Sequence, residues 1–109
     1  MPTPDTTGAP VGSAEVTSDA DGVAVIELIG EIDLSNVDAA RASIEPTLSK
    51  PHEQIVFDLD RLDFLDSSGI ALVLWAAAQA RSVELRRPTD IVRRIIEVTG
   101  LSDILQMDG

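Results

Sequence analysis

The chain has 109 residues and carries 19 acidic against 8 basic side chains, which gives a formal net charge of −11. This length suits one domain with a single core, and the acidic balance argues against nucleic acid or an anionic membrane as the main partner, because both require a basic surface. The absence of cysteine excludes disulfides and agrees with a cytoplasmic location. We expect no membrane insertion, since no run approaches the roughly 18 uncharged apolar residues of a spanning helix.

The first third of the sequence predicts a tail followed by a hairpin. Residues 1–13 are rich in Pro, Thr and Gly and are expected to form a disordered tail, while residues 14–109 form the domain. A short edge strand over 14–18 and a strand over 23–29 flank an Asp21-Gly22 pair, which favours a tight hairpin turn.

A loop over 30–34 is expected to lead into a helix that runs to about Ser49. Ser35, with Asp38 three residues later, resembles a capping box for that helix. Pro46 is expected to kink the helix or end it early, because proline lacks the backbone N–H. One face of the helix is apolar: Val37, Ala40, Ile44 and Leu48.

The central part of the sequence predicts a turn over 50–53, which places His52 at the surface, and a central strand over 54–59. An acidic turn then leads to two serines and a glycine. The run 70–80 that follows is apolar on nearly all sides, which is typical of a helix that is buried or covered by a partner.

A short strand over 83–86 and a last helix complete the predicted elements. Thr89 is the expected N-cap of this helix and Gly100 its stop. Its predicted apolar stripe consists of Ile91, Val92, Ile95, Ile96 and Val98. The order β-β-α-β-α-β-α predicts an α/β sheet covered by helices.

The most informative segment is Asp66-Ser67-Ser68-Gly69, at the start of the apolar helix. A serine at that boundary can cap the free backbone N–H groups, and the same helix end attracts phosphate. Asp66, with Asp63 nearby, makes the position acidic before any phosphate arrives. The segment therefore resembles a charge switch, although an unmodified serine cap is the plain alternative.

Two enzyme classes are disfavoured by the sequence. Asp58, Asp60, Asp63 and Asp66 invite comparison with magnesium-dependent phosphoryl transfer, but a solvated strand face explains them, and the only lysine, Lys50, lies in another turn. A serine hydrolase requires a base, and the single histidine lies in a predicted surface turn. We expect no enzyme activity, cofactor or metal.

Two further features have competing interpretations. Trp75 could anchor a partner, although core packing is the commoner role of tryptophan. Arg86, Arg87, Arg93 and Arg94 form either a docking patch or a solvated face, of which the second is favoured. The apolar helix over 70–80 permits a weak dimer but does not require one.

Three motifs in order resemble those of the STAS-domain anti-sigma factor antagonists of bacteria. They are Gly-Glu-Ile-Asp over 30–33, Phe-Leu-Asp-Ser-Ser-Gly over 64–69, and the segment 92–101. The resemblance covers nearly the whole chain beyond the tail, although the segment 69–88 is several residues shorter than is usual in the family. It implies a mixed sheet of four to five strands with helices packed mainly on one side.

The resemblance also implies a function in transcription regulation. Ser67 matches the family's phosphoacceptor, which is modified by a partner that is both anti-sigma factor and serine kinase and is restored by a metal-dependent serine phosphatase. Asp33 matches an acidic partner-binding residue, Asp66 and Ser68 flank the acceptor, and Gly69 would allow close approach of the kinase. The alternative is a STAS subunit of a stressosome-like complex or a lipid-transport ATPase.

Overall fold

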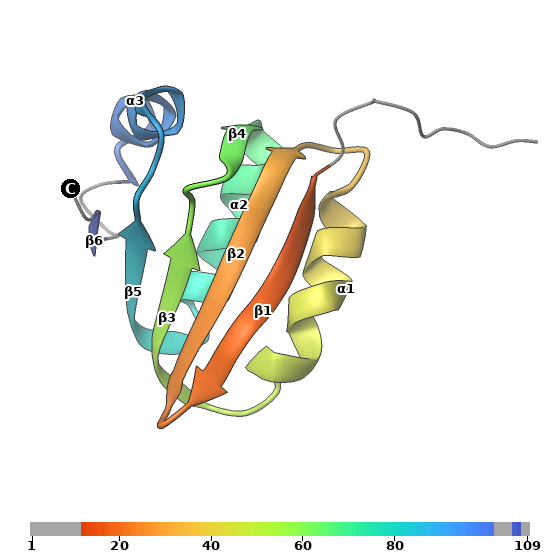
Figure 1. Ribbon diagram of the computed structural model, residues 1–109, viewed down its shortest axis with the longest axis vertical. Helices are drawn as coiled ribbons and strands as arrows, with labels where there is room; N and C mark the ends of the chain where they lie inside the picture. The colour runs from red at the N-terminus through yellow and green to blue at the C-terminus, as the bar shows by residue number, and fades with distance from the viewer. Residues whose placement is uncertain (1–11, 102–105, 108–109) are drawn as a thin grey trace, which may run out of the picture.

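A computed structural model describes residues 12–101 and 106–107, and it shows an α/β domain (Figure 1). Most of the predicted tail lies outside these residues. The elements in chain order are β1 (Ser13–Ala20), β2 (Val23–Ile32), α1 (Val37–Leu48), β3 (His52–Asp58), β4 (Leu62–Leu65), α2 (Ser67–Ala77), β5 (Ala80–Arg86), α3 (Asp90–Thr99) and β6 (Gln106–Met107).

The sheet is mixed, as the family resemblance implies. Its strands follow the order β1-β2-β3-β5-β6, and β4 pairs separately with β2. The β1–β2 pair is antiparallel, whereas β2–β3, β2–β4, β3–β5 and β5–β6 are parallel. Helices α1 and α2 lie on the same side of the sheet and leave the other face open (Figure 1).

The hairpin between β1 and β2 forms at the predicted turn. Asp21 and Gly22 both have positive φ, at 57° and 77°, and this left-handed pair matches the twist of two antiparallel strands. The predicted loop over 30–34 is wrong in its first three residues, because β2 continues to Ile32. Gly30, with φ of 77°, lies at a register shift where β2 turns to pair with β4.

Helix α1 has a different N-terminus from the one predicted. Its N-cap is Asn36, and the Ser35 hydroxyl instead donates to Asp33 Oδ1 over 2.5 Å. The helix passes through Pro46 and ends at Leu48, so the proline does not stop it early. Its predicted inner face is confirmed, since Ala40, Ile44 and Leu48 are buried.

The largest fully buried side chain is Phe57, near the C-terminal end of β3. Alternation along β2 buries Ala24, Ile26 and Leu28, while α3 contributes Val92 and Ile96. Two members of the stripe predicted for α3 do not join the core: Ile91 and Val98 are exposed. The predicted N-cap Thr89 and the left-handed stop at Gly100 are both confirmed.

His52 is buried, contrary to the prediction of a surface turn. It begins β3, and its Nε2 lies 2.9 Å from Asp19 Oδ1 while its Nδ1 lies 3.0 Å from the Lys50 carbonyl oxygen. Both ring nitrogens are occupied by structural contacts, so this histidine is not available as a catalytic base.

Candidate functional site

The N-terminus of α2 is capped by Asp66, whereas a serine was expected in this role. Asp66 Oδ1 accepts hydrogen bonds from the Ser68 N–H at 2.8 Å, the Gly69 N–H at 3.2 Å and the Ser68 hydroxyl at 2.5 Å. Aspartate is among the best N-cap residues because its carboxylate satisfies helix N–H groups that have no partner within the helix. These two N–H groups are therefore not free to bind phosphate.

Ser67 is the first residue of α2 and is exposed. Across residues 12–101, its hydroxyl has no hydrogen-bond partner. Since Asp66 and Ser68 together complete the cap, the Ser67 side chain is not needed to hold the helix. A free, exposed hydroxyl at a rigid helix start is a suitable acceptor for a phosphoryl group.

The loop that carries Asp33 lies against this helix start. The Asp66 N–H donates to the Ile32 carbonyl oxygen over 3.1 Å. Because Ile32 directly precedes Asp33, this hydrogen bond holds Asp33 beside the helix N-terminus. The structure thus brings together Asp33, Asp66, Ser67 and Ser68.

Gly69 is buried where α2 meets β2 and β4. A Cβ at this position would lie 2.8 Å from Leu65 Cβ and 3.1 Å from the Ile32 carbonyl oxygen. Both distances are shorter than normal contacts, so the packing of the helix onto its own strands already requires a glycine here. Gly69 therefore has a packing role within the domain, in addition to the close approach of a kinase that the resemblance implies.

The electrostatics of the site favour an ionised Asp66. The hydrogen bond from the Ser68 hydroxyl, supported by backbone N–H groups, lowers the pKa of the Asp66 carboxyl against the opposing effect of desolvation. At neutral pH the site therefore carries a fixed negative charge directly next to the Ser67 hydroxyl.

Replacing Asp66 by Asn is expected to lower the melting temperature more at about pH 7 than at about pH 3. Asn still caps a helix, so the substitution removes mainly the charge. Because the folded pKa of Asp66 is depressed, its ionised form stabilises the protein above the unfolded pKa, and this contribution is lost as the pH falls through the folded pKa. Thermal denaturation of the wild type and Asp66→Asn at both pH values checks this, with the exposed Asp63→Asn as control. A difference that does not change with pH would contradict it.

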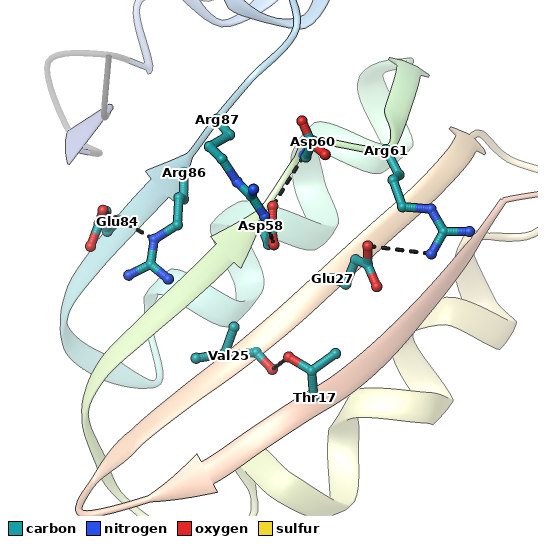
Figure 2. Close-up of polar contacts among 9 residues, drawn as sticks. All are labelled: Thr17, Val25, Glu27, Asp58, Asp60, Arg61, Glu84, Arg86 and Arg87. Carbon is teal, nitrogen blue, oxygen red and sulfur yellow. Dashed lines mark hydrogen bonds and ion pairs between the residues drawn. The ribbon is translucent and has the colours of Figure 1, made fainter.

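The four aspartates that suggested a metal site do not converge. Asp58 lies on the open face of the sheet, where its Oδ2 is 2.6 Å from Arg87 Nη2 (Figure 2). Asp66, by contrast, caps α2. Asp60 and Asp63 are exposed. Throughout the described ranges, no group of three possible metal-ligating side chains occurs.

The open face carries ion pairs in place of a basic patch. Arg86 lies 3.6 Å from Glu84, and Arg61 lies 3.6 Å from Glu27, next to the Arg87–Asp58 pair (Figure 2). The pKa of Asp58 is lowered by its hydrogen bond to Arg87, although desolvation is the largest single influence and acts in the opposite direction. For Arg86 and Arg87, these contacts agree with the favoured interpretation as a solvated face.

Trp75 does not join the cluster around Ser67. It lies eight residues further along α2, about 12 Å at the helical rise of 1.5 Å per residue. Its ring is half-buried against the core, and the Arg41 guanidinium of α1 lies 4.2 Å from the ring centroid. This cation–π contact joins the two helices, so the packing role of Trp75 is evident.

The sequence prediction missed β4 and the exposed apolar side chains at this end of the molecule. Phe64 on β4 and Leu34 beside Asp33 are both exposed, at 42% and 79%. A signal for β4 was present in the pattern of Leu62 and Leu65, both buried, around two exposed residues. Four residues are too few for alternation alone to identify a strand.

The fold and the site define an α/β domain with an exposed serine at a helix start. Residues 16–106 match the family model described as "Mlab, STAS domain", and the chain belongs to the STAS-domain family. The putative anti-sigma factor antagonist BtrV of Bordetella bronchiseptica is 31% identical over 88 residues, which cover 77% of this chain and 76% of that protein.

Two solved structures of one relative are also similar. The anti-sigma factor antagonist SpoIIAA in its unphosphorylated form is 27% identical, with a TM-score of 0.70 over 91% of this chain and 89% of that one. The Bacillus SpoIIAA in the phosphorylated form is 26% identical, with a TM-score of 0.63 over 91% and 92% of the two chains.

These relatives are non-enzymatic regulators, and they confirm that the chain is a regulator rather than an enzyme. The names of both relatives describe them as antagonists of anti-sigma factors. Within the residues that the structure describes, none of the helices has the length and apolar character that a membrane span requires.

Proposed function

We propose that this protein is an anti-sigma factor antagonist that is switched by phosphorylation of Ser67. In its unphosphorylated form it binds an anti-sigma factor that is also a serine kinase, and so releases a sigma factor for transcription in the cytoplasm. Phosphorylation of Ser67 ends this complex, and a metal-dependent serine phosphatase restores the binding form.

The observation that supports this proposal most directly is that, at the start of α2, the residues that cap the helix are not the residue whose hydroxyl is exposed. Asp66 and Ser68 cap the helix, and Ser67 is left exposed with its hydroxyl unbonded within residues 12–101. The relative SpoIIAA is known in both an unphosphorylated and a phosphorylated form, which favours the same modification here.

The partner surface that we infer is centred on Ser67 and extends to Asp33, Asp66, Ser68 and Gly69, with Trp75 at its far end. Along α2, the exposed residues Ala71 and Leu74 continue from Ser67 at helical spacing. These residues form an apolar strip that begins next to Ser67, and a protein partner can bury its surface against this strip.

The phosphorylation site can be tested with a kinase recovered by pull-down with the wild-type protein. After incubation with ATP, intact-mass analysis is expected to show one added phosphate on the wild type and on Ser68→Ala, and none on Ser67→Ala. Ser68→Ala is the matched control, because it removes the neighbouring hydroxyl. Phosphate on Ser67→Ala, or recovery of the same kinase by Ser67→Asp as efficiently as by wild type, would contradict the proposal.

A second candidate is a STAS subunit of another assembly, such as a stressosome-like complex or a lipid-transport ATPase. The observation that favours it is the family model itself, whose description names Mlab. Equal recovery of a transporter or scaffold by the wild type and Ser67→Asp, with no phosphate on the protein, would support this alternative.

A further inference from the structure

A hollow of about 350 Å³ lies between β4 and α3, and it is lined by Phe64, Asp90, Ile91, Arg94 and Ile95. We refer to it as the β4–α3 groove. Its walls include two of the large apolar side chains that the structure leaves exposed, Phe64 at 42% and Ile91 at 62%. Exposing such side chains on both walls of one groove is costly in water, and it is typical of a surface that a partner covers.

The groove lies at the same end of the molecule as Ser67. Strand β4 ends at Leu65 and α2 begins at Ser67, so Phe64 is only three residues from the acceptor. Figure 1 shows β4, the start of α2 and α3 together at this end of the sheet. A protein that docks on Ser67 is therefore within reach of the groove.

The charged side chains of the groove indicate which charge the bound segment carries. Six of the eight basic side chains have an acidic partner within 4.0 Å: Arg41, Lys50, Arg61, Arg81, Arg86 and Arg87. Arg93 has a partner as well. Arg94 alone has no ion pair or hydrogen bond within the described part of the chain, although the chain carries 19 acidic residues.

The absence of an Arg94–Asp90 ion pair is informative in itself. Both residues line the groove and are separated by one helical turn, a spacing at which such pairs form readily. No contact within 4.0 Å joins them, so the guanidinium remains available for a carboxylate from outside the chain. Asp90, in turn, is available for a donor on the same partner.

We infer that the β4–α3 groove binds a segment of the partner protein that presents a bulky apolar side chain next to an acidic residue. The apolar side chain lies between Phe64 and Ile91, and the carboxylate pairs with Arg94. This inference rests on the proposed function for the identity of the partner. It adds a second anchor that does not involve the Ser67 hydroxyl, so the groove binds its segment whether or not Ser67 is phosphorylated.

The chemistry of the groove can be tested with a phage-displayed library of random peptides, panned on the immobilised full chain. The enriched sequences are expected to combine an apolar residue with a neighbouring Asp or Glu. Synthetic peptides of this sequence are expected to bind Ile91→Thr and Arg94→Glu at least tenfold more weakly than wild type by fluorescence anisotropy. Val98→Thr is the matched control, because Val98 is also an exposed β-branched residue on α3, at 77% against 62% for Ile91, and it does not line the groove.

The same peptides separate this inference from the proposed function. Ser67→Asp is expected to bind them as tightly as wild type, because the acceptor is not part of the groove. Peptides that bind Ile91→Thr and Arg94→Glu unchanged, or a selection that enriches no such sequence, would overturn the inference while leaving the Ser67 proposal intact. Concentration-dependent dimerisation that Ile91→Thr abolishes would also overturn it, because a second copy of the chain would then be the occupant.

Discussion

Phosphorylation of Ser67 is expected to weaken the complex with the anti-sigma factor by about 100-fold, or about 2.8 kcal/mol at 1.4 kcal/mol per tenfold change. The phosphate adds about −1.5 to −2 charge next to Asp66, which is already ionised at neutral pH. Asp33 directly follows Ile32, whose carbonyl oxygen accepts a hydrogen bond from the Asp66 N–H. An interface that forms over this position has to bury the added charge next to like charges. The desolvation and the repulsion both weaken binding.

The capping geometry explains why the helix end does not offset this repulsion. A helix N-terminus usually stabilises an anion by up to about 1 kcal/mol at the surface, and it does so largely through free N–H groups. Here the Ser68 and Gly69 N–H groups already donate to Asp66. A phosphate on Ser67 therefore meets the Asp66 charge without gaining these donors.

Titration calorimetry with the purified anti-sigma factor measures the effect directly, using unphosphorylated, phosphorylated and Ser67→Asp protein. Ser43→Asp serves as the control, because it adds the same charge at an exposed position on α1. We expect Ser43→Asp to bind like wild type. If it weakens binding as much as Ser67→Asp, the effect is one of net charge and not of position, and the switch at Ser67 is contradicted.

Much of the fold could be predicted because the signals were local. The Asp21-Gly22 turn, the N-cap Thr89 and the stop at Gly100 each depend on the conformational preference of one or two residues. The central strand was evident from a run of apolar residues that are buried on both faces, since Ile55, Val56 and Phe57 are all buried.

What the sequence could not predict depends on contacts between distant segments. Residues 30–32 extend β2 only because β4 lies beside them, and β4 is a strand only because β2 is there. His52 is buried by a contact with Asp19, which is 33 positions away in the chain. In both cases a local interpretation as turn or loop was reasonable, and tertiary pairing overrode it.

The sequence placed the Asp-Ser-Ser-Gly segment at the start of a helix, as the structure has it, but it did not predict which residue caps that helix. The pattern Asp-Ser-Ser-Gly offers three residues that can cap a helix, and local preference does not choose among them. The choice follows from where α2 begins, and that is fixed by Gly69 packing on Ile32 and Leu65. Once the helix starts at Ser67, Asp66 takes the cap and the serine hydroxyl is exposed.

Replacing Phe57 by Ala is expected to destabilise the protein by about 3–5 kcal/mol, the range for truncating a buried aromatic residue. Phe57 is completely buried near the C-terminal end of β3, so the substitution leaves a cavity that neighbouring elements cannot fill. A domain of this size is stable by only about 5–15 kcal/mol. Such a loss is a large part of the total, and urea denaturation is expected to show a much lower midpoint at an unchanged slope.

The chain supplies its own control, because its only other phenylalanine is Phe64, which is 42% exposed. Phe64→Ala removes the same atoms from the wall of the β4–α3 groove and is expected to change the free energy of unfolding by less than about 1 kcal/mol. The two variants thus separate a side chain that maintains the fold from one that is available to a partner. Similar losses of stability in both would show that Phe64 belongs to the core, and the groove would then have no free apolar wall to offer.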